Sequence, residues 1–155
     1  MKVLFVCLGN ICRSPMAKGL MKKRLRELGL SEMIHVESRA TSSYEIGRPP
    51  HPRTLAILNR ENAPLPLKRA QRITPKDFET FDLIIGMDKK NVQDLSKMAN
   101  HNRYKIHLYN QINQLTKDID IADPYYTGRY EETFQAIDAR MDEWIEYFKK
   151  TGNSY

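Results

Sequence analysis

Residues 3–15 read Val3-Leu4-Phe5-Val6-Cys7-Leu8-Gly9-Asn10-Ile11-Cys12-Arg13-Ser14-Pro15. The first four are apolar and rich in β-branched and aromatic side chains, which predicts a short buried strand. Pro15 is favoured at the first position of a helix, because its missing N–H needs no partner there. The stretch therefore predicts a strand, a tight loop and a helix N-terminus. This combination gathers backbone N–H groups at the positive end of a helix dipole and suits an anion.

The side chains of this loop indicate that the anion is a phosphate group. Cys7 lies where the strand ends, and Arg13 follows after five intervening residues with a planar guanidinium that suits two phosphate oxygens. Gly9 allows the backbone to turn close to a ligand. N–H donors, a helix N-terminus and an arginine favour the thiolate form of a cysteine, and a thiolate in a phosphate cradle is a nucleophile aimed at phosphorus. Ser14 is placed to donate a hydrogen bond to Cys7. The alternative interpretation is a buried structural cysteine beside a surface arginine.

A second motif, Asp123-Pro124-Tyr125-Tyr126, supplies a candidate proton donor. A thiolate that attacks a phosphomonoester must expel a phenolate or alkoxide, which needs a proton on the far side of the phosphorus. Asp123 is therefore the expected general acid, and Tyr125 and Tyr126 would form apolar walls for an aromatic substrate. Taken alone, an Asp-Pro turn without chemistry is the commoner explanation. Asp88, which is expected to cap a helix at the same edge of the sheet, is a rival candidate for the acid.

Strands alternate with helices along the chain, which predicts one α/β domain of three layers with a four-stranded, parallel, doubly wound sheet. The expected strands cover residues 3–6, 34–38, 83–87 and 105–109. The expected helices cover residues 15–28, 53–62, a segment after Asp88, and 130–149. Residues 41–52 and 63–72 are rich in Pro, Gly or polar side chains and are expected to be irregular. Trp144 borders the apolar face of the last helix and is expected in the core.

Composition narrows the class of partner. The 155 residues carry a formal net charge of +6 that is spread along the chain without a basic tail, which favours phosphorylated substrates over nucleic acid. The two cysteines make neither a disulfide framework nor a metal site on their own, so no metal or cofactor is expected. The apolar run ending at Leu8 is too short for a signal peptide, and no apolar stretch approaches the roughly 20 residues of a membrane span. We expect a cytoplasmic protein, monomeric or weakly homodimeric.

The stretch VCLGNICRSP, residues 6–15, resembles the signature of the low-molecular-weight protein-tyrosine phosphatases. Residues 41–47, 81–88 and 123–126 resemble the same family, and the resemblance runs from Met1 to about Lys150. It implies one phosphatase domain over residues 1–155. It also implies hydrolysis of phosphotyrosine in proteins, and of aryl phosphates, through a cysteinyl-phosphate intermediate and without a cofactor or metal.

The resemblance implies roles for individual residues. Cys7 is the nucleophile, Arg13 the phosphate clamp, and Asp123 the general acid and then the general base. The other loop residues expected to bind phosphate or a similar oxyanion are Leu8, Gly9, Asn10, Ile11, Cys12 and Ser14. The residues expected to fix the shape of the loop by hydrogen bonds are Asn10, Ser14 and Ser38. The aromatic residues expected to flank a phenol ring are Tyr44, Tyr125 and Tyr126.

Comparison with the family's branches sharpens the expected substrate. Ile11 resembles the tyrosine branch, whereas the arginine-phosphatase branch carries threonine at this position. The related arsenate reductases need further cysteines downstream, and this chain has none after Cys12. A histidine that many members carry ahead of an Ala-Arg pair is missing where this chain reads Lys68-Arg69-Ala70-Gln71-Arg72. That departure concerns how the nucleophile is tuned, not which reaction it performs.

Two forms of regulation and several other functions stay open at this point. Cys12 indicates reversible oxidation, because a neighbouring thiol can trap an oxidised Cys7 as a disulfide. Its alternative role is simple packing under the loop. Tyr125 and Tyr126 are candidates for phosphorylation by a tyrosine kinase. The alternative functions are a phosphatase of other phosphomonoesters or of phosphoarginine, a non-catalytic phosphate-binding module, and a thiol redox sensor.

Overall fold

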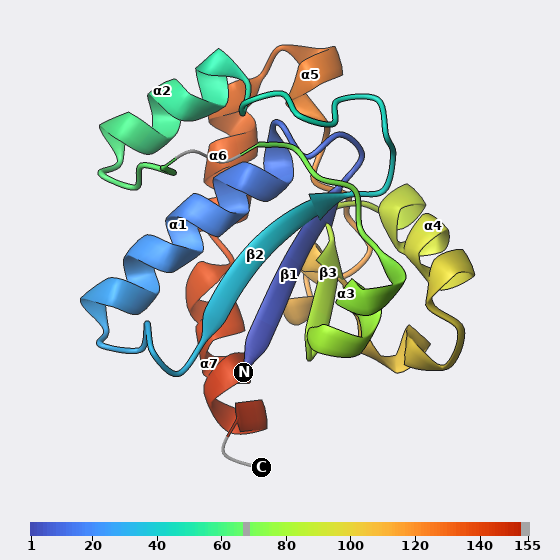
Figure 1. The fold of residues 1–155 in the computed structure, drawn as a ribbon. Coiled ribbons are helices and arrows are strands. Elements are labelled where there is room, and N and C mark those ends of the chain that lie inside the picture. The colour runs from blue at the N-terminus through green and yellow to red at the C-terminus, as the bar shows by residue number, and fades with distance from the viewer. Residues whose placement is uncertain (67–68, 153–155) are drawn as a thin grey trace.

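The computed structural model describes residues 1–66 and 69–152. Its centre is a four-stranded, all-parallel sheet in the order β2-β1-β3-β4, with helices on both faces (Figure 1). The strands are β1 (Lys2–Cys7), β2 (His35–Ala40), β3 (Leu83–Gly86) and β4 (Ile106–Leu108). The predicted α/β class and parallel, doubly wound sheet are confirmed.

Strand β1 lies between β2 and β3 and is buried on both faces. Val3 and Phe5 belong to a core cluster with residues of α1 (Arg13–Glu27), α2 (Pro52–Arg60), α6 (Tyr130–Asp138) and α7 (Met141–Gly152). Leu4 and Val6 belong to a second cluster with residues of α3 (Pro75–Thr80) and α4 (Lys89–Ala99). Successive side chains of a strand point to opposite faces, so a central strand with helices on both sides needs an uninterrupted apolar run. This explains why residues 3–6 do not alternate with polar residues.

The shorter elements connect this framework. They are the 3-10 helices η1 (Asn100–Lys105) and η2 (Tyr109–Ile112) and the one-turn helix α5 (Pro124–Thr127). Residues 41–51 contain no helix or strand, as expected. The expected connector at residues 63–72 contains no helix in its described part, but Arg72 forms an isolated parallel bridge with Ala40. Lys68, where the family histidine is missing, lies outside the described residues. No helix in the described part of the chain has the length and apolar character to cross a bilayer.

The prediction of one helix over residues 130–149 is wrong, because the structure divides this segment into α6 and α7. The carbonyl of Ile137 accepts a hydrogen bond from the buried Tyr109 hydroxyl and another from the backbone N–H of Arg140. In an uninterrupted α-helix, the carbonyl of Ile137 would instead accept a hydrogen bond from the backbone N–H of Met141. The helix therefore ends at Asp138, and Trp144, fully buried as expected, packs in α7.

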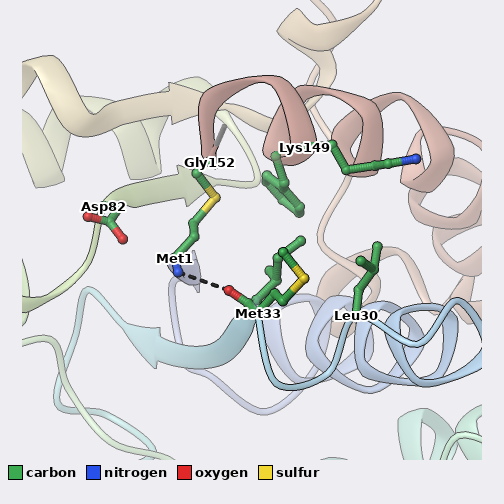
Figure 2. Close-up of a pocket in the computed structure, with 8 residues that line it drawn as sticks. Met1, Leu30, Met33, Asp82, Lys149 and Gly152 are labelled. Atoms are coloured by element: carbon green, nitrogen blue, oxygen red, sulfur yellow. Dashed lines mark hydrogen bonds between the residues drawn. The ribbon is translucent and has the colours of Figure 1, made fainter. Parts of the chain in front are cut away.

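Parallel strands bring their carboxyl ends to one edge of the sheet, and the loops after β1 and β3 meet there. The opposite edge carries an apolar cavity of about 380 Å³ (Figure 2). Met1 lines it, and the terminal amine of Met1 donates to the carbonyl of Met33 over 2.9 Å. Cys7 lies five residues beyond Lys2 along β1, or about 17 Å. This cavity is therefore separate from the edge where Cys7 lies.

Close packing of α1 on α2 generates a test of the fold. A Cβ on Gly19 would lie 2.8 Å from Leu58 Cδ2 and 3.1 Å from the carbonyl oxygen of Ala63. Overpacking costs about 1–3 kcal/mol and alanine recovers about 1 kcal/mol through helix propensity. We expect Gly19→Ala to lower the free energy of unfolding in urea by about 1 kcal/mol. Gly152→Ala, whose Cβ would meet nothing within 4 Å, is the control and should not lower it. Equal stability of the two variants would contradict the tight contact.

Candidate active site

The loop between β1 and α1 curls around the sulfur of Cys7. Cys7 Sγ lies 3.1 Å from Ser14 Oγ, and the backbone N–H groups of Asn10 and Ser14 donate to it over 3.3 and 3.5 Å. Asn10 Nδ2 donates to Ser14 Oγ, so the hydroxyl proton of Ser14 is left for Cys7 Sγ or for the carbonyl of Arg39, 3.4 Å away. The sulfur is therefore held by several donors at the N-terminus of α1.

Asn10 shapes this loop. Its φ is 60°, a left-handed conformation that asparagine tolerates better than most residues. Its Nδ2 donates to Ser14 Oγ over 2.8 Å and to Ser38 Oγ over 2.9 Å, so the three residues expected to form a network are in contact. Its Oδ1 accepts from the backbone N–H of Gln71 over 3.1 Å, a contact the sequence did not indicate. The loop is thus fixed to β2 and to the connector that precedes α3.

Arg13 is almost fully buried and is held from one side. Its Nη1 donates to Asp88 Oδ2 over 2.6 Å and to the carbonyl of Ile121 over 2.8 Å. Its Nη2 lies 3.4 Å from Asp123 Oδ2, and its Nε has no hydrogen-bond partner in the described part of the chain. Burial opposes the charge of Arg13, but the neighbouring groups of Cys7, Asp123 and Asp88 outweigh it and raise its pKa. The guanidinium stays charged, with its Nε–Nη2 edge not occupied by a short hydrogen bond.

Asp88 has two contacts, of which the sequence predicted one. Its Oδ1 accepts from the backbone N–H of Asn91 over 2.7 Å and so caps α4, as expected. Its Oδ2 binds Arg13. The signal for this second contact was available, since Asp88 comes two residues after β3, which neighbours β1 in a parallel sheet. Asp88 therefore positions the arginine as well as the helix.

Asp123 lies at the mouth of the loop. Its Oδ1 accepts from the backbone N–H of Tyr125 over 3.1 Å and caps α5, while its Oδ2 faces Arg13 Nη2. Its side chain is 20% exposed, compared with 2% for Arg13. A carboxyl group with one oxygen anchored and partial access to solvent can exchange a proton with a bound substrate or a water molecule.

The predicted residues converge on a small cavity of about 50 Å³. Its lining residues are Cys7, Leu8, Gly9, Ile11, Cys12, Tyr44, Glu45, Asp123, Tyr125 and Tyr126. Tyr44 and Tyr126 are more than 70% exposed, and the rings of Tyr125 and Tyr126 meet edge to face with centroids 5.3 Å apart. Four predicted residues do not line the cavity and are buried instead: Asn10, Arg13, Ser14 and Ser38. Within the described ranges, no group of three or more His, Cys, Asp and Glu side chains could hold a metal ion.

Two features of the site were missed at the level of sequence: one residue that lines the cavity and one that contacts a lining residue. Glu45 lies close to Gly9, where a Cβ would be 3.1 Å from Glu45 Cγ, and it pairs with Arg48 over 2.9 Å. Tyr130 contacts Cys12, with 3.5 Å between the tyrosine hydroxyl and the sulfur. The Tyr130 ring is stacked against His51 at 4.8 Å and lies 4.5 Å from the Arg53 guanidinium. Apart from the Glu45–Arg48 pair, these contacts join residues far apart in the chain, and no local pattern signals them.

The chain matches one protein family over nearly its whole length. A family model described as "Low molecular weight phosphotyrosine protein phosphatase" matches residues 2–154. The chain belongs to this family. A low-molecular-weight phosphatase of Staphylococcus epidermidis, named protein-tyrosine-phosphatase PtpA, is 37% identical over 151 residues, which are 97% of this chain and 96% of the relative.

Solved structures agree with this membership in the low-molecular-weight phosphatases. YfkJ from Bacillus subtilis is 36% identical with a TM-score of 0.93, covering 97% of this chain and 96% of that one. SP-PTP, a low-molecular-weight protein tyrosine phosphatase from Streptococcus pyogenes, is 41% identical with a TM-score of 0.83, covering 94% and 91%. The predicted family, fold and phosphatase class are confirmed.

The buried thiol of Cys12 generates a pH prediction. Burial raises the pKa of Cys12 from 9.0 to about 12, an effect that the Tyr130 hydroxyl only partly opposes. The folded state therefore keeps this proton between pH 9 and 12, whereas the unfolded chain loses it. The free energy of unfolding of wild type, measured relative to that of Cys12→Ser, should therefore fall above pH 9 by up to about 1 kcal/mol per pH unit. Urea unfolding of both proteins from pH 7 to 11 measures this difference, and a constant difference would contradict it.

Proposed function

We propose that this phosphatase hydrolyses phosphotyrosine in proteins through a cysteinyl-phosphate intermediate. The observation that carries the proposal is that two of the three expected catalytic groups line one cavity and the third contacts one of them. Cys7 and Asp123 line the cavity. The Nη2 of Arg13 lies 3.4 Å from Asp123 Oδ2, and its Nε has no hydrogen-bond partner among the described residues. A nucleophile, a fixed cation and a proton donor are what metal-free transfer of a phosphoryl group requires.

Phosphate binding follows from the loop and from Arg13. The Nη1 of Arg13 is fully used by Asp88 and Ile121, which aligns the guanidinium without blocking its other edge. That edge offers two parallel donors, the geometry that binds two phosphate oxygens together. The backbone N–H groups of residues 8–13 surround the remaining oxygen at the N-terminus of α1. The fully buried Asn10 keeps these donors in place before substrate binds.

In the first chemical step, the Cys7 sulfur attacks phosphorus and the bond to the tyrosine oxygen breaks. Asp123 transfers its proton to that oxygen, so tyrosine leaves as a neutral phenol. In the second step, water attacks phosphorus, Asp123 takes up a proton of the water, and the P–S bond breaks. Ser14, 3.1 Å from the sulfur, donates a hydrogen bond to the departing thiolate. The products are tyrosine and inorganic phosphate, and the enzyme returns to its starting state.

The walls of the cavity support an aromatic substrate. Ile11 and the rings of Tyr44, Tyr125 and Tyr126 line or border it, and aromatic side chains pack on a phenol ring by offset or edge contacts. Phosphoarginine would instead place a polar guanidinium group against these walls. We therefore expect kcat/KM for a phosphotyrosine peptide to exceed that for a phosphoarginine peptide, and a reversed preference would assign the second substrate.

The covalent intermediate can be tested directly. Rapid denaturation of wild type at alkaline pH during turnover of a ³²P-labelled aryl phosphate should give protein-bound label that peptide mapping assigns to Cys7. Cys7→Ser should lower kcat for aryl phosphate hydrolysis at least about a thousandfold, because the hydroxyl is a much weaker nucleophile at neutral pH. Cys12→Ser is the matched control for the site of labelling, because it removes the other thiol and should leave the label on Cys7. Label that is absent from Cys7 during turnover, or full activity of Cys7→Ser, would disprove the mechanism.

The two candidate acids can be separated by the leaving group. Asp123→Asn and Asp88→Asn each remove a carboxyl group while keeping a good helix cap. We expect Asp123→Asn to slow hydrolysis of alkyl-substituted phenyl phosphates by about 10²–10⁴, and of nitrophenyl phosphates much less, because good leaving groups need no proton. Asp88→Asn should slow all of them by a similar factor, since it disturbs only the position of Arg13. A leaving-group dependence that follows Asp88 would exchange the two roles.

A further inference from the structure

A second hollow opens beside the catalytic cavity and shares part of its wall. This basic groove has a volume of about 480 Å³, and its lining residues are Leu8, Thr41, Ser42, Ser43, Tyr44, Arg72, Lys90, Asp94, Lys97 and Met98. Leu8 and Tyr44 also line the catalytic cavity. The groove therefore begins at the catalytic rim and extends toward α4.

The charge of the groove is positive. Its charged side chains are three cations and one carboxylate, namely Arg72, Lys90, Lys97 and Asp94. Lys90 pairs with Asp94, with 2.9 Å between Nζ and Oδ1. Arg72 and Lys97 have no carboxylate within 4.0 Å among residues 1–66 and 69–152. Two cations of the groove thus remain without an internal counter-charge.

These cations are held on rigid backbone. The backbone at Arg72 is fixed by its bridge to Ala40 at the end of β2, and Arg72 Nε donates to the carbonyl of Thr41 over 3.1 Å. Among the residues that the structure describes, neither Nη group of Arg72 has a hydrogen-bond partner, so both can donate to another acceptor. Lys90 and Lys97 are seven residues apart on α4, so they lie on one face about 10 Å apart along the helix. Little ordering is needed before an anion binds.

We infer that the basic groove is a subsite for carboxylate side chains that flank the phosphotyrosine of the substrate. This inference rests on the proposed function, because it takes phosphotyrosine to be the group above Cys7. An extended peptide advances about 3.3 Å per residue, so the roughly 10 Å along α4 between Lys90 and Lys97 matches some three residues next to the phosphotyrosine. Aspartate or glutamate at these positions would meet Arg72 and Lys97, whereas lysine or arginine would be repelled.

The experiment compares two phosphotyrosine peptides that differ only in having glutamate or glutamine at the three positions on either side. The readout is the ratio of their kcat/KM values in low salt. Surface ion pairs are individually weak, so we expect wild type to prefer the glutamate peptide by about fivefold. The ratio should fall toward one in Arg72→Gln/Lys97→Gln and in Lys90→Gln/Lys97→Gln. It should also fall at high ionic strength, because exposed charges are screened.

The matched control is Lys22→Gln/Arg26→Gln, which removes the same two residue types from exposed positions on α1. It should keep the wild-type ratio. A ratio of one in wild type, or a ratio that the control lowers as much as the groove variants, would overturn the inference. The same ratio measured as Kd on Cys7→Ser protein does not need turnover. If wild type hydrolyses neither peptide, the proposed function is wrong. The Kd ratio still tests whether the groove binds carboxylate side chains.

Discussion

The ion pair between Arg13 and Asp88 connects the parts of this structure that matter for catalysis. It links the loop after β1 to the helix after β3, across two neighbouring strands of the sheet. A buried guanidinium is stable only with its charge compensated and its donors satisfied. Asp88, Asp123 and the carbonyl of Ile121 meet part of this requirement, and they leave the Nε–Nη2 edge of Arg13 without a short hydrogen bond. In the proposed mechanism, the phosphate group of the substrate supplies the missing acceptors of this cation.

The loop and the acid depend on this anchor in different ways. Asn10 fixes the loop from the side of β2, so the sulfur of Cys7 keeps its place even if the arginine moves. Asp123 sits on a one-turn helix at the surface, and its contact with Arg13 is long, at 3.4 Å. This difference suits the proposed mechanism, in which Cys7 keeps one position while Asp123 exchanges a proton first with a phenol and then with a water molecule.

Much of this arrangement was predictable from local patterns. The apolar run before Cys7 predicted the central strand, and the motif at residues 7–15 predicted the loop with its donors. Contacts between distant segments were not predictable in the same way. The break at Asp138 arises because Tyr109, nearly thirty residues earlier, binds a helix carbonyl. Likewise, Glu45 enters the cavity from an irregular segment whose path is set by packing rather than by periodicity.

The division of the last helical segment into α6 and α7 has a consequence for the residue that contacts Cys12. Because α6 and α7 are separate, the register of α7 in the core does not dictate the orientation of Tyr130, which holds Cys12. A small shift of α7 therefore need not rotate Tyr130 away from the loop. The break therefore separates the packing of α7 in the core from the position of Tyr130 beside the loop that contains Cys12.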